Sequence, residues 1–226
     1  MFNRDGLNVF LDISTYCNAA CPQCHRTNPN GLEKADWLPL VQWNLQTFKN
    51  AYRLHLKSKT NYTSFDFCGT WGDPVMNKDL LKMVEYIIEN TNSHVRIDTN
   101  GSIRDEEWWW NLGIIAGKRL TATFAVDGIN QEMHSHYRRN TNLDKVLNNM
   151  KALSNTLAKV IVRIIVFKHN ESYLNEIKQL AINNGAIEVI ATPSDRWSQG
   201  PVFNFVDENN NDQTLEKSKI LYEHKV

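Results

Sequence analysis

The chain has 226 residues, of which 42% are hydrophobic and 22% charged, so it can bury a core of about one large domain. Its 25 Lys and Arg residues balance 25 Asp and Glu residues, and this balance indicates neither a nucleic-acid partner nor an anionic membrane surface. The apolar stretches are strand-sized, well short of the roughly 18 residues that a membrane span needs. The N-terminal sequence has no apolar signal region, so we expect a cytoplasmic protein.

Strand-like and helix-like patterns alternate along the chain. Short segments rich in β-branched and aromatic residues predict six strands, at 8–13, 63–67, 94–98, 120–126, 160–167 and 187–191. Apolar stripes of helical period predict helices at 77–89, with Asn77 as N-cap, and around 143–153. A further helix begins at Asn170 and ends near Gly185, and a less clear one lies within 42–57.

Strands separated by helices predict repeated βα units and a parallel α/β sheet with right-handed crossovers. Periodicity does not distinguish an open sheet from a partial barrel. In both architectures the functional residues gather at the carboxyl ends of the strands. We expect this domain to cover residues 1–200 and a polar tail to cover 201–226, with a linker at 207–214 and at most a short helix at 215–226.

Three cysteines follow the first predicted strand: Cys17, Cys21 and Cys24, in a C-x3-C-x2-C spacing. Thiolates this close on one loop favour a single soft metal centre. Four-iron clusters normally take four cysteines, so three would leave one iron open for catalysis. The alternative is structural zinc in an α/β binding protein, with His25 or Cys68 as fourth ligand. Zinc motifs are more often two separated C-x-x-C pairs, so the spacing favours a catalytic cluster.

Further motifs follow the next strands in order. They are Cys68-Gly-Thr-Trp-Gly72-Asp73-Pro74, Asp98-Thr99-Asn100-Gly101, Ala125-Val126-Asp127-Gly128 and the stretch from His134 to Leu147. Together with the cysteine triplet, this series resembles the radical S-adenosylmethionine (SAM) superfamily. It is most similar to the branches that modify peptides (SPASM/twitch-like) and to the molybdopterin-pathway branch. Each motif is weak alone, but five in the right order form a specific pattern.

The resemblance implies a partial (β/α)6 barrel that holds a 4Fe–4S cluster on Cys17, Cys21 and Cys24. It also implies SAM contacts, with Asp73 facing the methionyl ammonium group and Arg138 facing the carboxylate. The full set of SAM-binding candidates is Gln23, Gly72, Asp73, Pro74, Asn100, Asp127 and Arg138.

In this superfamily an electron from the reduced cluster cleaves SAM, and the resulting 5′-deoxyadenosyl radical abstracts a hydrogen atom from the substrate. The resemblance favours a peptide or protein residue as substrate, with a nucleotide or another small molecule next. It implies a flavodoxin- or ferredoxin-like electron donor.

Several positions depart from the family pattern or have a simpler interpretation. Gln23 stands where an aromatic residue is usual, and Asp73 replaces the usual glutamate. No cysteine follows Cys68, so we expect one cluster only. Asn100 precedes a glycine and is also typical of a tight turn. Arg163, on an alternating strand, faces either the sheet's ligand-binding side, where it could bind an anionic group, or solvent.

Overall fold

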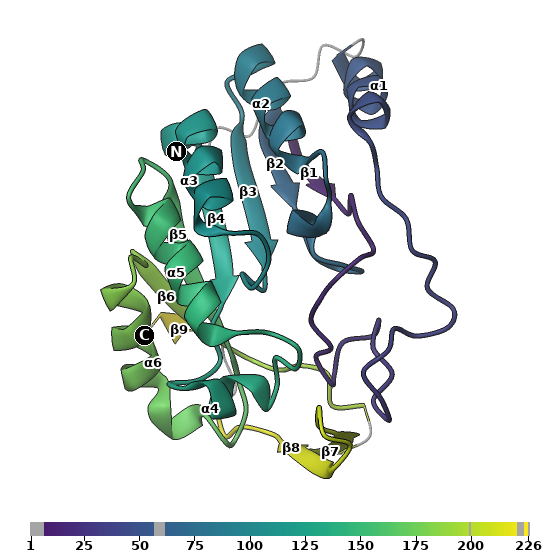
Figure 1. Cartoon of the computed structure of the whole chain (residues 1–226), viewed down its shortest axis with the longest axis vertical. Coiled ribbons are helices and arrows are strands. Elements are labelled where there is room, and N and C mark those ends of the chain that lie inside the picture. Colours follow the sequence, from purple (N-terminus) through teal and green to yellow (C-terminus); the bar gives the residue numbers. More distant parts are fainter. Residues whose placement is uncertain (1–6, 57–61, 199, 221–223, 226) are drawn as a thin grey trace.

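The computed structural model describes residues 7–56, 62–198, 200–220 and 224–225. Six parallel strands form one sheet in sequence order (Figure 1). They are β1 (Leu7–Leu11), β2 (Tyr62–Phe67), β3 (His94–Thr99), β4 (Leu120–Ala125), β5 (Lys159–Val166) and β6 (Glu188–Pro193). A short strand, β9 (His224–Lys225), pairs antiparallel with β6. All six predicted strands are present, with ends that differ by one or two residues.

The crossover helices lie on one side of this sheet (Figure 1). They are α1 (Leu45–Leu56), α2 (Leu80–Asn90), α3 (Glu106–Ala116), the short α4 (Gln131–Ser135), α5 (Leu143–Ser154) and α6 (Leu174–Asn183). Single 3₁₀ turns lie at Pro74–Met76, Gly117–Arg119 and Glu171–Tyr173. No helix in the described ranges has the length and apolar character needed to cross a membrane.

The strands show why only one face of the sheet is covered. In β3 the side chains of Val95, Ile97 and Thr99 are buried, whereas those of His94, Arg96 and Asp98 are exposed. Successive side chains of a strand point to opposite faces, so the first set packs beneath the helices and the second faces the open side. The main core lies between sheet and helices and includes Trp109, which packs against Phe124 with ring centroids 4.8 Å apart.

One predicted helix cap was wrong, and a second residue at a helix start uses its side chain elsewhere. Asp79, not Asn77, occupies the cap of α2, and the amide of Asn77 donates to the carbonyls of Ile13 and Trp43. Asn170 makes no side-chain cap bond; its amide donates to the carbonyl of Asp127 and its oxygen accepts the N–H of Phe167. Both asparagines are buried. Asn170 stands at the N-cap position of the 3₁₀ turn that leads into α6, as the sequence predicts, but its side chain binds loop groups instead of the first turn.

The predicted polar tail was also wrong in its structure. Strands β7 (Val202–Val206) and β8 (Asp212–Glu216) form an antiparallel hairpin, and most of the predicted linker is its turn and second strand. Of the predicted short helix, residues 215–216 and 224–225 are strand, and 221–223 and 226 lie outside the described residues. Phe205 and Leu215 are buried and pack with Cys21, so the hairpin covers the cysteine loop.

Candidate active site

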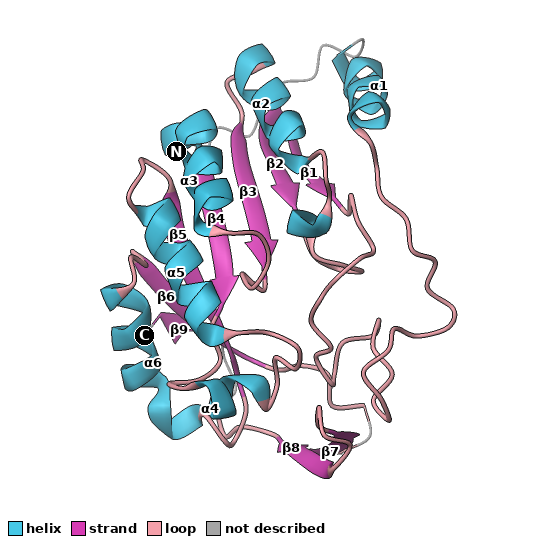
Figure 2. Ribbon diagram, viewed as in Figure 1, coloured by secondary structure: helices cyan, strands magenta, loops and turns pink. Residues whose placement is uncertain are grey.

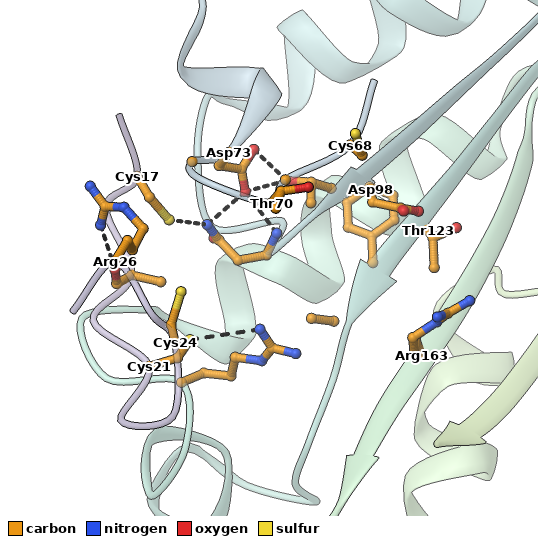
Figure 3. A pocket seen from close by; sticks show the side chains of 18 of the residues that line it. Cys17, Cys21, Cys24, Arg26, Cys68, Thr70, Asp73, Asp98, Thr123 and Arg163 are labelled. Atoms are coloured by element: carbon orange, nitrogen blue, oxygen red, sulfur yellow. Dashed lines mark hydrogen bonds between the residues drawn. The ribbon is translucent and has the colours of Figure 1, made fainter. Parts of the chain in front are cut away.

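A cavity of about 360 Å³ lies toward the carboxyl ends of the parallel strands (Figure 3). It is lined by the loop after β1, the carboxyl-end regions of β2, β3 and β4, the segment between α4 and α5, Arg163 of β5 and the loop after β6. Those used below are Cys17, Cys21, Cys24, Arg26, Cys68, Gly72, Asp73, Asp98, Asn100, Thr123, Arg138, Arg163 and Arg196. Of the candidate residues from the sequence, the three cysteines, Gly72, Asp73, Asn100 and Arg138 line this cavity, whereas Gln23, Pro74 and Asp127 do not.

The three cysteines lie on the long loop between β1 and α1, which passes the strand ends on its way to α1 (Figure 2). The loop turns tightly at the triplet, because the N–H of Cys24 donates to the Cys21 carbonyl at 3.0 Å. The buried Arg26 side chain donates to the carbonyls of Thr15 and Ala19, so it fixes the loop from within. Sequence reasoning missed Arg26, which shows no pattern beyond lying near the triplet.

Burial raises the pKa of the Cys17 and Cys21 thiols above the usual range. A bound metal centre would be needed to keep such buried thiols deprotonated. Within the described ranges, no three His, Cys, Asp or Glu side chains are grouped so that they could hold one metal ion. Thiolates on one zinc ion would lie within about 4 Å of each other, at Zn–S distances of about 2.3 Å. A 4Fe–4S cluster spreads its thiolates over different iron atoms, and three thiolates at one cavity are a donor set that fits such a cluster.

The turn after β2 packs directly on the start of the cysteine loop. A Cβ atom at Gly72 would lie 2.1 Å from the Ser14 carbonyl oxygen, so only glycine allows this approach. The N–H of Asp73 donates to the Tyr16 carbonyl at 2.7 Å. Pro74 begins the following 3₁₀ turn and does not line the cavity. The turn therefore fixes the position of the cysteine loop relative to β2.

Asp73 is buried and accepts hydrogen bonds from several groups of the chain. The N–H of Val75, the hydroxyl of Thr99, and both the backbone N–H and the side-chain amide of Asn100 donate to it. Burial raises the pKa of the Asp73 carboxyl, and the N–H groups of Asn100 and Val75 oppose that shift. Asp73 is thus a fixed anchor between two motifs as well as part of the cavity wall.

Asn100 connects the third motif to the cysteine loop. Its amide donates to Asp73 at 2.7 Å and to the Asn18 side chain at 2.8 Å, and lies 3.7 Å from the Cys17 sulfur. Its oxygen accepts the N–H of Ser102 at 2.9 Å, as in a tight turn. Asn100 therefore combines the two roles that the sequence left open: it forms the turn and it lines the cavity.

Arg138 and Asp127 form a buried ion pair beside the cysteines. The Arg138 Nε lies 2.5 Å from an Asp127 carboxylate oxygen, and its Nη1 lies 3.7 Å from the Cys21 sulfur. Burial alone would lower the pKa of Arg138, but the Asp127 carboxylate raises it above the usual range. Only Arg138 lines the cavity; Asp127 stands behind it and also accepts the N–H of Ile165 at 2.6 Å.

Two further polar residues hold the cysteine loop without lining the cavity. The buried Arg139 donates to the carbonyls of Ala20 and Val206, and so joins the cysteine loop to the β7–β8 hairpin. The amide of Gln23 donates to the carbonyl of Arg196, and its oxygen accepts the hydroxyl of Ser194. Gln23 thus fastens the cysteine loop to the segment after β6.

Comparisons with known proteins agree with this geometry. No protein-family model matches the chain. The chain is 27% identical over 207 residues to the GTP 3′,8-cyclase of Pasteurella multocida (strain Pm70), covering 84% of this chain and 56% of the relative. The chain of Streptococcus suis SuiB bound to S-adenosylmethionine matches with a TM-score of 0.65 and 15% identity, over 86% of this chain and 42% of SuiB.

Two further solved structures share the fold. Histidine-tagged anSMEcpe with bound AdoMet matches with a TM-score of 0.65 and 16% identity, over 91% of this chain and 53% of that chain. Methylornithine synthase (PylB) matches with a TM-score of 0.58 and 17% identity, over 84% of this chain and 54% of that chain. These proteins are radical SAM enzymes. The chain is thus similar to members of the radical SAM superfamily in sequence and in fold. Its sheet is the partial barrel expected for that superfamily.

The chain spans about half the length of the proteins it matches. The shared fold alone does not specify its reaction.

Proposed function

We propose that this chain binds a 4Fe–4S cluster through Cys17, Cys21 and Cys24 and uses it to cleave SAM reductively for hydrogen abstraction from a substrate. The observation that carries the proposal is that these cysteines share one cavity with Asp73, Asn100 and Arg138. When bound, the cluster would supply the electron for SAM cleavage and one iron without a cysteine ligand. The protein would orient SAM and exclude water from it.

The charges of the cavity wall support a place for each end of the methionyl group. Arg138, although paired with Asp127 through Nε, presents its other nitrogens beside Cys21 and is the candidate for the SAM carboxylate. Asp73 is the candidate for binding the ammonium group of SAM. Its carboxylate already accepts hydrogen bonds from Thr99 and Asn100 and would accept a further one from the ammonium group. Gly72 would bring the turn's backbone close to the same group.

The cluster assignment is tested by iron and sulfide analysis after anaerobic reconstitution. We expect Cys17→Ser, Cys21→Ser and Cys24→Ser each to lose the cluster. Cys68→Ser is the matched control, because Cys68 also lines the cavity but belongs to the end of β2. Full cluster content in Cys21→Ser, or its loss in Cys68→Ser alone, would contradict the assignment.

The reaction is tested with the reconstituted wild-type protein. After reduction by dithionite it should bind SAM and release 5′-deoxyadenosine slowly, even without its true substrate. A protein that holds a full cluster but neither binds SAM nor forms 5′-deoxyadenosine would disprove the proposed chemistry. Colourless protein with one zinc per chain would instead favour the zinc-stabilised binding protein.

Within this function we favour a peptide or protein residue as substrate over a nucleotide or another small molecule. SuiB has been solved bound to precursor peptide SuiA, and anSMEcpe with the Cp18Cys peptide. The proposal includes a flavodoxin- or ferredoxin-like electron donor and a cytoplasmic location. Reduction of the cluster by a purified flavodoxin, followed by its absorbance change, tests the donor.

A further inference from the structure

The charged side chains of the cavity differ in whether the chain itself provides them with a partner. Six charged side chains line it: Arg26, Asp73, Asp98, Arg138, Arg163 and Arg196. Four have partners within the protein, namely backbone carbonyls for Arg26 and Arg196, Asp127 for Arg138, and the Thr99 and Asn100 groups for Asp73. Among the described residues, no hydrogen bond or ion pair involves the side chain of Asp98 or Arg163.

Asp98 and Arg163 lie on the open face of the sheet, away from the cysteines (Figure 3). Asp98 on β3 is in register with Thr123 on β4, and Arg163 on β5 is in register with Ala125, two residues further along β4. With strands about 4.8 Å apart and a rise of about 3.3 Å per residue, their Cα atoms are about 12 Å apart along the sheet. The two charges are opposite, yet they do not form an ion pair with each other.

The surroundings of Arg163 make an ordinary surface role a poor explanation. Arg163 lines the cavity, and its neighbours on the same face of β5 are the apolar Ile161 and Ile165. The hydroxyl of Thr123 lies between the two charges, on the strand that separates them. A ligand that lies across β4 would therefore meet an anion, a hydroxyl and a cation in that order.

We propose that Asp98 and Arg163 determine substrate specificity by binding an ammonium group and a carboxylate of one substrate. The inference rests on the proposed function, since it places this substrate in the cavity that holds the cluster and SAM. Arginine binds a carboxylate through two parallel hydrogen bonds, and Asp98 accepts from an ammonium group. The ligand is a zwitterion, either a free molecule of the amino-acid type or a peptide segment with a basic and an acidic side chain.

Binding to the anaerobically reconstituted, SAM-loaded protein tests the proposal by calorimetric titration of three probes. 6-Aminohexanoate carries both charges, hexanoate only the anion and hexylamine only the cation. We expect 6-aminohexanoate to bind at least tenfold more tightly than either of the others. Weaker or equal binding of 6-aminohexanoate, or no binding of any probe, would overturn the proposal.

Variants assign each charge to its residue. Arg163→Gln should weaken the binding of hexanoate and 6-aminohexanoate at least tenfold and leave hexylamine unchanged, because the charged partner of the carboxylate is lost. Asp98→Asn should show the reverse pattern. Arg96→Gln is the matched control: Arg96 lies on the same face of β3 but outside the cavity, and should bind all probes as the wild type does. Equal losses in Arg96→Gln and Arg163→Gln would refute the assignment.

A blocked peptide, acetyl-Lys-Gly-Glu-amide, separates the two sources of the zwitterion. Tighter binding than that of 6-aminohexanoate supports a peptide segment, and weaker binding supports a free molecule. If the wild-type protein holds no cluster or does not bind SAM, the proposed function itself is wrong. If the wild-type protein holds the cluster and binds SAM but binds none of the probes, only this inference is wrong.

Discussion

Removal of the Arg138 side chain should destabilise the fold as well as weaken SAM binding. In Arg138→Ala the Asp127 carboxylate, which has 0% side-chain exposure, would lose its ion-pair partner. Of its donors among the described residues, the N–H of Ile165 would remain. Breaking a buried pair by deleting one partner typically costs about 3–5 kcal/mol, because a charge is left uncompensated. Such a loss is a large fraction of the stability of an ordinary domain.

A double-mutant cycle separates the pair from the individual side chains. Urea denaturation of the wild type, Arg138→Ala, Asp127→Asn and the double variant gives the free energies of unfolding, measured anaerobically at matched cluster content. The double variant should be less destabilised than the sum of the two single changes, by about 1–3 kcal/mol, since neither charge is left alone. Arg138→Lys should be intermediate, because it keeps the charge without the planar fork.

Three results would contradict these expectations for Arg138. Wild-type stability in Arg138→Ala would show that the pair contributes nothing to folding. Strict additivity in the cycle would show that the two side chains act independently. If stability falls as expected while SAM affinity stays at the wild-type value, Arg138 is a structural residue only, and Arg163 becomes the candidate for the SAM carboxylate because Arg139 does not reach the cavity.

Three further predictions concern other parts of the site. Gly72→Ala should lower the unfolding temperature, with a cost of about 1–3 kcal/mol or more, because its Cβ would lie 2.1 Å from the Ser14 carbonyl oxygen; an unchanged melting curve would contradict the observed turn. Burial lowers the pKa of His134 from 6.5 to about 4. Between those pH values the unfolded chain binds a proton at His134 that the folded chain does not bind. The free energy of unfolding should therefore fall by about 3 kcal/mol from pH 7 to pH 4. Urea denaturation of His134→Gln should show a smaller fall over the same range. Arg139→Ala should speed the loss of iron in air, followed by absorbance, whereas Arg119→Ala, which also removes bonds to backbone carbonyls but far from the cavity, should not.

The sequence was sufficient to predict the sheet and to identify motifs that the fold brings to one cavity. The strands are short, rich in β-branched residues and bounded by turns, so each can be recognised from its own sequence without knowing which strands pair with it. Parallel strands carry their motifs to one edge, and the cavity indeed contains the cysteines, Asp73, Asn100 and Arg138. In the part of the chain that repeats the βα unit, the local sequence pattern therefore predicts the observed topology.

The errors occurred where a polar residue acts over a long distance in the sequence. Asn77 lies next to a helix start and has the chemistry of a cap, but its partners are 64 and 34 residues away. The sequence also did not reveal that Asp127 pairs with Arg138, which separates its carboxylate from the lining of the cavity. The β7–β8 hairpin buries only Phe205 and Leu215 fully, which is too weak an alternation to be recognised among Asn and Asp residues. Spacing alone cannot reveal such partners.

The partners of the cavity charges also determine which residues can change without loss of the fold. Asp73 and Arg138 bind groups of the chain as well as facing the cavity, so substitutions there combine a folding cost with a binding cost. Asp98 and Arg163 are exposed and have no protein partner among the described residues, so their replacement leaves no buried charge behind. Substitutions that change the substrate can therefore occur at Asp98 and Arg163 on the open face of β3 and β5, while the cavity residues beside the cysteines remain unchanged. Loss of probe binding at unchanged stability in Arg163→Gln would be the direct sign of that division.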